Sequence, residues 1–475
     1  MIGRVPAELG HTQQLAIRWK NFRGFSDSEW ILLKPLTILL GANGSGKSSL
    51  IEPLLLLKQS LISRTGSSAL LTNGEYVDSG SYLDLVRCHD SSKHVEFEIQ
   101  WHGHPKQSDL EPVGTYEPGG AAFAFQQEKS SDDIDLASYR VADIYRRRMI
   151  SRRLTKGGTY SLNLPEITED DGAISRVGRR AMRKSRPVDF LFRSERIRRA
   201  EQEAASDDGD APSFPLRLED PLVRLYCQAV DYVKWELEDL TRRFYYLGPL
   251  RERPKRVYER LGEMPPDVGT RGEHAPEIIY RWRRSRTQLK ELQGWLHRFG
   301  IRDRLAWKDV GPAGFSLHLD SGDDLPTSFV DAGFGVSQVL PLIVQALQLP
   351  RASWLITEQP EIHLNPRLQT ELADLLVDVV ARKSGAIVET HSEHLLLRLR
   401  NLVASGAISS DLVALYFLEN DGDASRVREV PIEESGRIDP EAWPQGFFED
   451  SLREALTLAQ TQSGRRKRLS AQADA

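Results

Sequence analysis

The chain has 475 residues, a formal net charge of −5, 40% hydrophobic residues and 28% charged residues. This length allows about three domains' worth of material with a large core. The mild acidity excludes a protein that is basic throughout, as a nucleic-acid coat protein is, while leaving room for a local basic groove. The two cysteines, Cys88 and Cys227, are far apart in sequence, which excludes a disulfide framework or a zinc site.

The N-terminal residues show no basic patch followed by an apolar segment, so no signal peptide is expected. The longest apolar stretch, Ile31 to Leu40, is interrupted by Lys34 and Pro35 and is shorter than the roughly 20 residues of a membrane span. We therefore expect a cytoplasmic protein with no membrane partner.

Several short elements precede the first motif. Alternating apolar and polar residues predict strands at Gln14 to Trp19 and, further along, at Val95 to Trp101. Trp30 to Leu33 is a further predicted strand. Leu36 to Leu40 is almost wholly apolar, as in a buried parallel strand, and Ser48 to Ile62 reads as a helix.

Between that strand and that helix lies a P-loop, Gly41-Ala42-Asn43-Gly44-Ser45-Gly46-Lys47-Ser48. Its glycines let backbone amides turn towards phosphate oxygens, and the helix N-terminus adds positive potential. Lys47 is expected to reach the outer phosphates of ATP, and Ser48 to bind Mg²⁺. The residues predicted to contact the nucleotide here are Asn43, Gly44, Gly46, Lys47, Ser48 and Ser49. Residues 1–104 are assigned to this first half of a nucleotide-binding unit.

Residues 105–244 differ from what precedes them. They are polar, with weak apolar periodicity until a helix predicted at residues 222–240, and residues 141–200 hold 16 Lys/Arg against 7 Asp/Glu. We expect a basic, mainly helical insertion. Its arginine clusters could bind the phosphates of DNA or RNA, dock a partner protein, or pair with acidic runs at 169–171 and 207–210.

The C-terminal half again alternates strands and helices. Predicted strands lie at residues 245–247, 315–319, 354–357, 386–388 and 412–418, and predicted helices at 289–299 and 339–349. This alternation predicts an α/β fold with a mainly parallel core sheet, an antiparallel β subdomain and the insertion. We assign residues 245–420 to the second half of the unit and 421–475 to an extension with a disordered tail.

This half carries four motifs in a fixed order. Gly335 to Gln338 opens an apolar helix, Glu358 ends a buried strand, Leu364 to Pro366 follows a turn, and His391 follows another buried strand. The order resembles the signature, Walker B, D-loop and switch histidine of ABC-type AAA-family ATPases. The resemblance implies that Glu358 holds Mg²⁺ and that His391 senses the γ-phosphate. It also implies that Gly335, Ser337 and Gln338 bind the nucleotide of a second head in a homodimer or higher homo-oligomer.

Further motifs narrow the resemblance. Lys20 to Phe25 resembles the opening of RecF, SMC and overcoming-lysogenisation-defect (OLD) ATPases. Gly248 to Arg251, Glu358 to Glu361 and Trp443 to Phe448 resemble a bacterial ATPase family with an uncharacterised C-terminal extension, of which Septu-like subunits are members. That family implies an ATP-dependent switch working with a nuclease partner in anti-phage defence.

One position departs from the ABC pattern. The acid that activates water normally follows the Walker B carboxylate, but here Gln359 follows Glu358. An amide accepts no proton, so we expect slow turnover, with Gln359 positioning water or Glu361 replacing the acid, and His391 completing the catalytic group. A RecF-like DNA-repair ATPase and a non-hydrolysing, ATP-held scaffold remain alternatives, as does tolerance of glutamine at this position.

Asp421-Gly422-Asp423, with Glu419 nearby, resembles the metal-binding acids of a Toprim nuclease. Only 52 residues follow Asp423 in the 475-residue chain, too few for that fold. We predict a turn between two strands.

Overall fold

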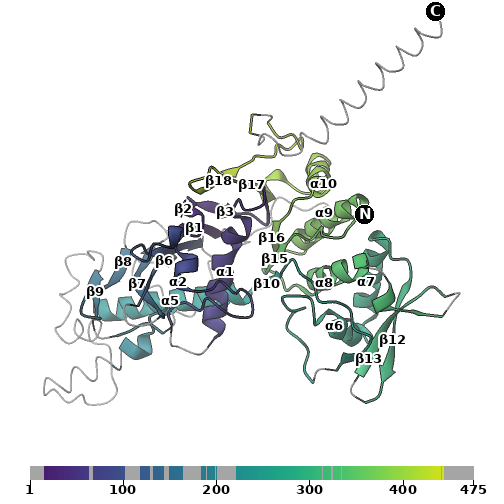
Figure 1. Cartoon of the computed structure of the whole chain (residues 1–475), viewed down its shortest axis with the longest axis horizontal. Coiled ribbons are helices and arrows are strands. Elements are labelled where there is room, and N and C mark those ends of the chain that lie inside the picture. The colour runs from purple at the N-terminus through teal and green to yellow at the C-terminus, as the bar shows by residue number, and fades with distance from the viewer. Residues whose placement is uncertain are drawn as a thin grey trace, which may run out of the picture.

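A computed structural model describes residues 15–63, 68–101, 118–128, 132–143, 149–163, 183, 185–188, 190–197, 199, 221–260, 262–312, 314–322, 325–332, 334–439 and 441–442. Three β-sheets form in this part of the chain. In Figure 1 the parallel sheet lies centrally, with the antiparallel sheet, α1 and α5 on one side and α6 to α8 on the other.

The central sheet confirms the predicted parallel core. Its order is β10 (Phe244–Leu247), β15 (Trp354–Glu358), β16 (Gly385–Glu389), β4 (Leu36–Gly41), β17 (Val413–Asn420) and β18 (Ser425–Glu429). The first five strands run parallel, and β18 pairs antiparallel with β17.

Both faces of this sheet are buried, because alternate residues of each strand enter different cores. Leu39 of β4 and Ile356 of β15 belong to the core shared with the antiparallel sheet, α1 (Lys47–Ile62) and α5 (Pro221–Arg242). Ile38 and Leu355 belong to a second core. That core includes α6 (Ala275–Trp282), α7 (Arg286–Arg298), α8 (Phe334–Gln348), α9 (Pro366–Ala381) and α10 (Glu393–Ala404). Burial on two faces explains why these strands read as continuous apolar runs.

A small sheet packs in the second core. It has the order β11 (Tyr258–Glu259), β13 (Gly314–Asp320) and β12 (Arg304–Val310), and β14 (Thr327–Ser328) also pairs with β13. Short helical turns complete the described elements: α2 (Tyr82–Leu85), η1 (Arg87–His89), η2 (Phe329–Asp331) and η3 (Ser410–Leu412). No helix in the described ranges is both long and apolar enough to cross a membrane.

The antiparallel sheet has the order β2 (Phe25–Asp27), β1 (Leu15–Phe22), β5 (Val95–Trp101), β6 (Pro118–Gln127), β7 (Ile134–Asp143), β8 (Met149–Leu154) and β9 (Tyr160–Asn163), with β3 (Ile31–Leu33) also paired with β1.

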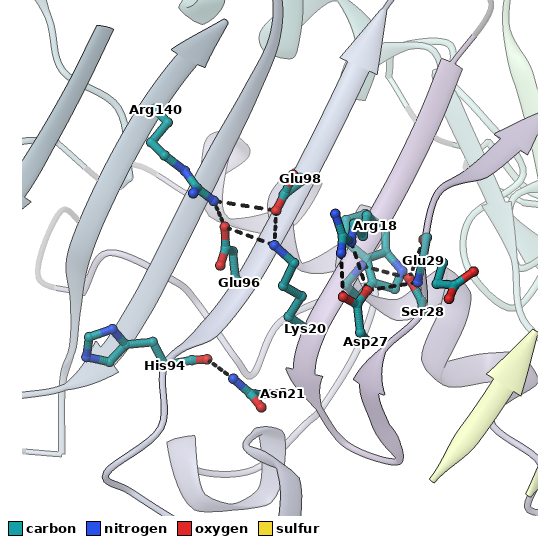
Figure 2. A network of polar contacts seen from close by, with 11 residues as sticks. Arg18, Lys20, Asn21, Asp27, Ser28, Glu29, His94, Glu96, Glu98 and Arg140 are labelled. Atoms are coloured by element: carbon teal, nitrogen blue, oxygen red, sulfur yellow. Dashed lines mark hydrogen bonds and ion pairs between the residues drawn. The ribbon is translucent and has the colours of Figure 1, made fainter. Parts of the chain in front are cut away.

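A ladder of ion pairs crosses three strands on one face of this antiparallel sheet and fixes their register. Lys20 contacts Glu96 and Glu98 on β5, and Arg140 on β7 reaches the same carboxylates (Figure 2). Arg140 spans β6 because its neighbour there, Ala122, is small.

The insertion differs from the mainly helical body that we predicted. Its described residues contribute four strands, β6 to β9, which extend the sheet begun by β1 and β5, and the long helix α5. In β6 all of Ala121 to Phe125 are buried, and in β7 the alternation in Ile134 to Val141 supplies a buried face. The prediction missed these strands because polar flanking residues dominated the average character of the segment. The tail after residue 463 and the acidic runs at 169–171 and 207–210 lie outside the described residues.

The β17–β18 hairpin confirms the predicted turn at Asp421 to Asp423. The carboxylate of Asp421 accepts hydrogen bonds from the amides of Asp423, at 3.0 Å, and Ala424, at 2.8 Å. Asp423 pairs with Arg87 at 2.8 Å. These acids therefore have structural partners. No group of three or more metal-binding side chains is found among the residues that the structure describes.

One arginine of the basic insertion is not on its surface. Arg152 is fully buried, and its guanidinium lies 4.0 Å from the ring centroid of Phe192 and 5.3 Å from that of Tyr160. It donates hydrogen bonds to Ser185, at 2.8 Å, and Tyr226, at 3.2 Å. Arg152 therefore joins β8 to the aromatic core and is excluded from any direct contact with nucleic acid.

Replacing Arg152 with alanine should lower the free energy of unfolding by about 3 kcal/mol, because the change leaves a cavity between aromatic rings and removes two buried donors. Chemical denaturation followed by tryptophan fluorescence measures this. Arg153→Ala, at the exposed neighbouring position, is the matched control and should shift the value by less than about 0.5 kcal/mol. Equal effects of the two substitutions would contradict the burial of Arg152.

Candidate functional site

The P-loop leaves β4 and enters α1 through three glycines with left-handed or related backbone angles. Gly41, Gly44 and Gly46 have φ of 145°, 76° and 102°. At Gly41 a Cβ would lie 2.3 Å from the carbonyl oxygen of Leu418 on the neighbouring strand, so only glycine fits. The predicted residues Asn43, Gly44 and Ser48 are exposed in this loop. The loop thus has the conformation in which successive amides can surround a phosphate.

Lys47 begins α1 and is folded back onto the loop. Its Nζ donates to the carbonyl oxygens of Gly41, at 3.0 Å, and Ala42, at 2.8 Å. Burial lowers the pKa of Lys47, while the charges of Glu389 and Glu361 oppose that shift. Neutral carbonyl groups thus hold the Lys47 ammonium in place. Charged phosphate oxygens are stronger hydrogen-bond acceptors for this ammonium than the carbonyl oxygens are.

Two carboxylates face the start of α1. Glu358 ends β15 and Glu389 ends β16, and the two residues are direct partners in the strand register. The hydroxyl of Ser48 donates to Oε2 of Glu389 at 2.8 Å, and the hydroxyl of Tyr246 donates to Oε1 of Glu358 at 2.7 Å. Burial raises the pKa of Glu358, and the charge of Glu389 adds to the shift, while the hydrogen bond from Tyr246 lowers it.

Our sequence analysis missed Glu389. The sequence did hold a signal, because β16 is a buried strand that ends in a carboxylate, as Trp354 to Glu358 does. The pairing of β15 with β16, which brings the two carboxylates together, could not be predicted from one sequence. Ser48, Glu358 and Glu389 together offer the hydroxyl and carboxylate oxygens that Mg²⁺ prefers. The site fits that ion with phosphate oxygens and water as its remaining ligands.

The three predicted catalytic residues lie beside these carboxylates. Gln359 has a left-handed backbone, with φ 46°. Its backbone N–H donates a hydrogen bond to the carbonyl oxygen of Glu389 at 2.7 Å. Glu361 accepts a hydrogen bond from the amide of His391 at 2.6 Å. The structure therefore brings Gln359, Glu361, His391 and the P-loop lysine into one polar cluster.

Two buried atoms in this cluster have no hydrogen-bond partner in the described structure. They are Oε2 of Glu361 and Nε2 of His391. Burial raises the pKa of Glu361, although the His391 amide lowers it. Burial, followed by the charge of Lys47, lowers the pKa of His391, so its imidazole is neutral at pH 7. Unpaired buried polar atoms of this kind mark a place where a ligand or ordered water completes the hydrogen bonding.

The residues predicted to bind the nucleotide of a second head lie elsewhere. Ser337 and Gln338 are buried in the first turns of α8, and a Cβ at Gly335 would approach the carbonyl oxygen of His363 at 3.8 Å. Gln338 and His363 line one groove with residues 249–255, and none of residues 41–49, all of which are described, lines it. The structure thus separates these residues from the P-loop of the same chain.

Asn365, within the predicted D-loop, has a structural role. Its side chain accepts a hydrogen bond from the amide of Leu368 at 3.1 Å and caps the N-terminus of α9.

The Lys20 to Phe25 opening needs a glycine at position 24 for close packing. A Cβ there would lie 2.4 Å from Oγ of Ser425. The opening motif therefore packs against the β17–β18 hairpin beneath the P-loop.

Solved structures similar to this chain are heads of SMC proteins. One, bound to the C-winged helix domain of ScpA, has 13% sequence identity and a TM-score of 0.38, covering 89% of this chain and 98% of that chain. A head with an extended coiled coil bound to the C-terminal domain of ScpA, derived from Pyrococcus furiosus, has 12% identity and a TM-score of 0.38 over 89% and 98%. An SMC head from Thermotoga maritima has 10% identity and a TM-score of 0.34 over 89% and 99%.

Comparison with curated proteins finds no match. A model of a family described as "Protein of unknown function (DUF3696)" matches residues 408–458, within the half that resembles ATPases with an uncharacterised extension. A second model, described as "AAA domain, putative AbiEii toxin, Type IV TA system", matches residues 36–398. This match covers more than half of the chain and runs from β4 and the P-loop to beyond His391. The chain therefore belongs to this family of AAA domains.

Proposed function

We propose that the chain binds ATP with Mg²⁺ at the carboxyl ends of β4, β15 and β16, and that it hydrolyses the nucleotide slowly as an ATP-dependent switch. The observation that carries this proposal is the convergence of the P-loop with the Glu358–Glu389 pair and the Glu361–His391 contact at one edge of the sheet. Ligands bind at this edge in open parallel sheets.

Phosphate binding is assigned to the loop and to Lys47. The amides of the loop and the N-terminus of α1 favour an anion there. The Lys47 ammonium exchanges the carbonyl oxygens of Gly41 and Ala42 for phosphate oxygens. Since those two bonds are to neutral acceptors, the exchange replaces them with stronger, charge-assisted ones.

The cation is assigned to Ser48, Glu358 and Glu389. When bound, Mg²⁺ neutralises charge that develops on the phosphate oxygens. The hydroxyl of Ser48 already lies between the loop and Glu389, so the chain presents these oxygens before the nucleotide arrives. Tyr246 fixes Glu358 in the orientation that faces them.

Slow hydrolysis follows from the identities of residues 359 and 361. Gln359 can orient water by hydrogen bonding but accepts no proton from it. Glu361 is a carboxylate, but one of its oxygens is occupied by the amide of His391. Neutral His391 can donate or accept one hydrogen bond through Nε2 and suits the role of a γ-phosphate sensor. The ATP-bound state should therefore be long-lived.

That long-lived state supports a pairing of two heads and the docking of a partner effector. The family description names a putative toxin, and residues 248–251 resemble an ATPase family whose Septu-like members act in anti-phage defence. A nuclease in this assembly would be a separate chain, because Asp421 and Asp423 are held in a hairpin turn. Exposed arginines of the insertion, such as Arg153, Arg183 and Arg196, suit contact with nucleic-acid phosphates.

A non-hydrolysing, ATP-held scaffold is the second candidate. The amide at position 359 favours it, because no carboxylate takes that place. The two candidates differ in turnover alone, so the rate of phosphate release separates them.

Gln359→Glu should raise steady-state phosphate release at least about tenfold, since general-base catalysis typically contributes 10²–10⁴-fold. Lys47→Ala, which removes the phosphate-binding ammonium, gives the background rate. Turnover by the wild type above this background supports a slow ATPase, whereas its absence with ATP still bound supports the scaffold. An unchanged or lower rate in Gln359→Glu would show that the glutamine is not the cause of slow turnover.

Glu361→Gln should stabilise the nucleotide-free protein at pH 8, because burial raises the pKa of Glu361 and ionising it in the folded state is unfavourable. A raised folded-state pKa means that the wild type loses stability as pH rises through that value. The gain should therefore shrink towards pH 3, where the carboxyl is almost fully protonated in both states. Denaturation at both pH values measures the effect, with exposed Glu419→Gln as the control. A gain that grows on acidification would contradict this account.

A further inference from the structure

Two short turns carry the groups to which catalysis is assigned. Gln359 and Glu361 lie in the turn after β15, which spans residues 359–365 and is called the β15 turn below. His391 lies in the turn after β16, which spans residues 390–392 and is called the β16 turn. Helix α9 follows the first turn, and α10 follows the second.

Two hydrogen bonds join these turns close to the strand ends. The backbone N–H of Gln359 donates to the carbonyl oxygen of Glu389 at 2.7 Å, and Glu361 accepts from the backbone N–H of His391 at 2.6 Å. Both bonds involve the first three residues of the β15 turn. They leave its second half, residues 362–365, to be positioned by other contacts.

Gln369, the fourth residue of α9, supplies such a contact with both ends of its side-chain amide. Its Nε2 donates to the carbonyl oxygen of Leu364 in the β15 turn at 2.9 Å. Its Oε1 accepts from the hydroxyl of Ser392 in the β16 turn at 2.7 Å. Because a carbonyl oxygen can only accept, the NH₂ group must face Leu364. One side chain therefore bridges the far ends of the two turns.

Ser392 connects this bridge to His391. Its hydroxyl donates to Gln369 and also accepts from the backbone N–H of Leu395 at 3.0 Å, as the N-cap of α10. Its own N–H donates to Oγ1 of Thr390 at 3.0 Å, and both residues are buried. His391 thus lies between two buried residues that are bonded to each other. A displacement of His391 must therefore also displace Ser392 and the amide bonded to it.

The β15 turn has an unfavourable backbone conformation at two places. Gln359 and His363 are not glycines, yet their φ angles are 46° and 64°. Left-handed residues of this kind persist only where surrounding contacts hold them. Leu364, which directly follows His363, is the residue that Gln369 holds. Loss of this bond would let residues 362–364 relax towards commoner backbone angles.

We propose that Gln369 is a positioning residue, which makes the β15 turn follow the β16 turn when His391 meets the γ-phosphate. The inference rests on the proposed function, in which His391 senses that phosphate, and adds the route by which the contact reaches the second half of the β15 turn. His363 there is exposed and lines an open groove with Gln338 of α8. The presence of the γ-phosphate would thus change the protein surface at His363.

The test compares two variants by amide hydrogen exchange, with Mg²⁺ and either ADP or a non-hydrolysable ATP analogue. In Gln369→Met the side chain keeps its length but is at most a weak acceptor. The matched control is Gln293→Met in α7. The Gln293 amide also bridges two backbone groups, the carbonyl of Asp303 at 2.8 Å and the N–H of Leu305 at 3.3 Å, and both glutamines are half-buried.

In the wild type, the γ-phosphate should slow exchange in both turns relative to ADP, at protein concentrations too low for self-association. Gln369→Met should keep this slowing in the β16 turn. In the β15 turn the variant should reduce it at least about fivefold, which is the low end of ordinary coupling between two sites. Gln293→Met should keep the slowing in both turns, because its bridge lies in another part of the fold.

Slowing in both turns of Gln369→Met, as in the wild type, would overturn the proposal. Loss of slowing in both turns, or an equal loss in Gln293→Met, would also overturn it, since either result indicates general damage to the fold. A wild type whose P-loop is protected by nucleotide, but whose β15 turn ignores the γ-phosphate, would overturn this inference and leave ATP binding intact. A wild type whose P-loop does not respond to nucleotide would instead overturn the proposed function, and the role of Gln369 with it.

Discussion

Burial of the central parallel sheet on both faces is the constraint on which the rest of the molecule depends. Because β4, β15 and β16 are parallel neighbours, their carboxyl ends open at one edge and place Gly41, Glu358 and Glu389 side by side. The two cores hold the sheet from opposite sides through alternate residues such as Ile38 and Leu39. Polar side chains are then free to gather only where the strands end.

At that edge, binding groups are kept in a state that costs stability. Lys47 is bonded to neutral carbonyls, Glu358 and Glu361 are buried carboxylates, and His391 is neutral with an unpaired nitrogen. A fold optimised for stability alone would pair or remove these groups. Their persistence together beside a glycine-rich loop is the physical mark of a site that a charged ligand completes.

Local chemistry allowed much of this site to be predicted from sequence. The P-loop and the strand that ends at Glu358 have patterns that are complete within a few residues, and the hairpin at Asp421 follows from its turn residues. What could not be predicted depends on strand order and burial. Glu389 joins the site only because β16 lies between β15 and β4, and Arg152 is buried only because Phe192 and Tyr226 come from distant segments. The prediction of a mainly helical insertion was wrong in the described residues for the same reason, since β6 is stabilised by pairing with β5, and β7 by pairing with β6.

The most direct test of the central claim measures ATP affinity by calorimetry, with Mg²⁺ and with EDTA, at constant ionic strength. If Ser48, Glu358 and Glu389 hold the cation on the nucleotide, Mg²⁺ should tighten ATP binding to the wild type at least about tenfold. That gain should fall in Glu389→Gln and persist in Glu419→Gln, an exposed control. Equal affinity of the wild type with and without Mg²⁺, or an undiminished gain in Glu389→Gln, would contradict the assignment of these oxygens to the magnesium site.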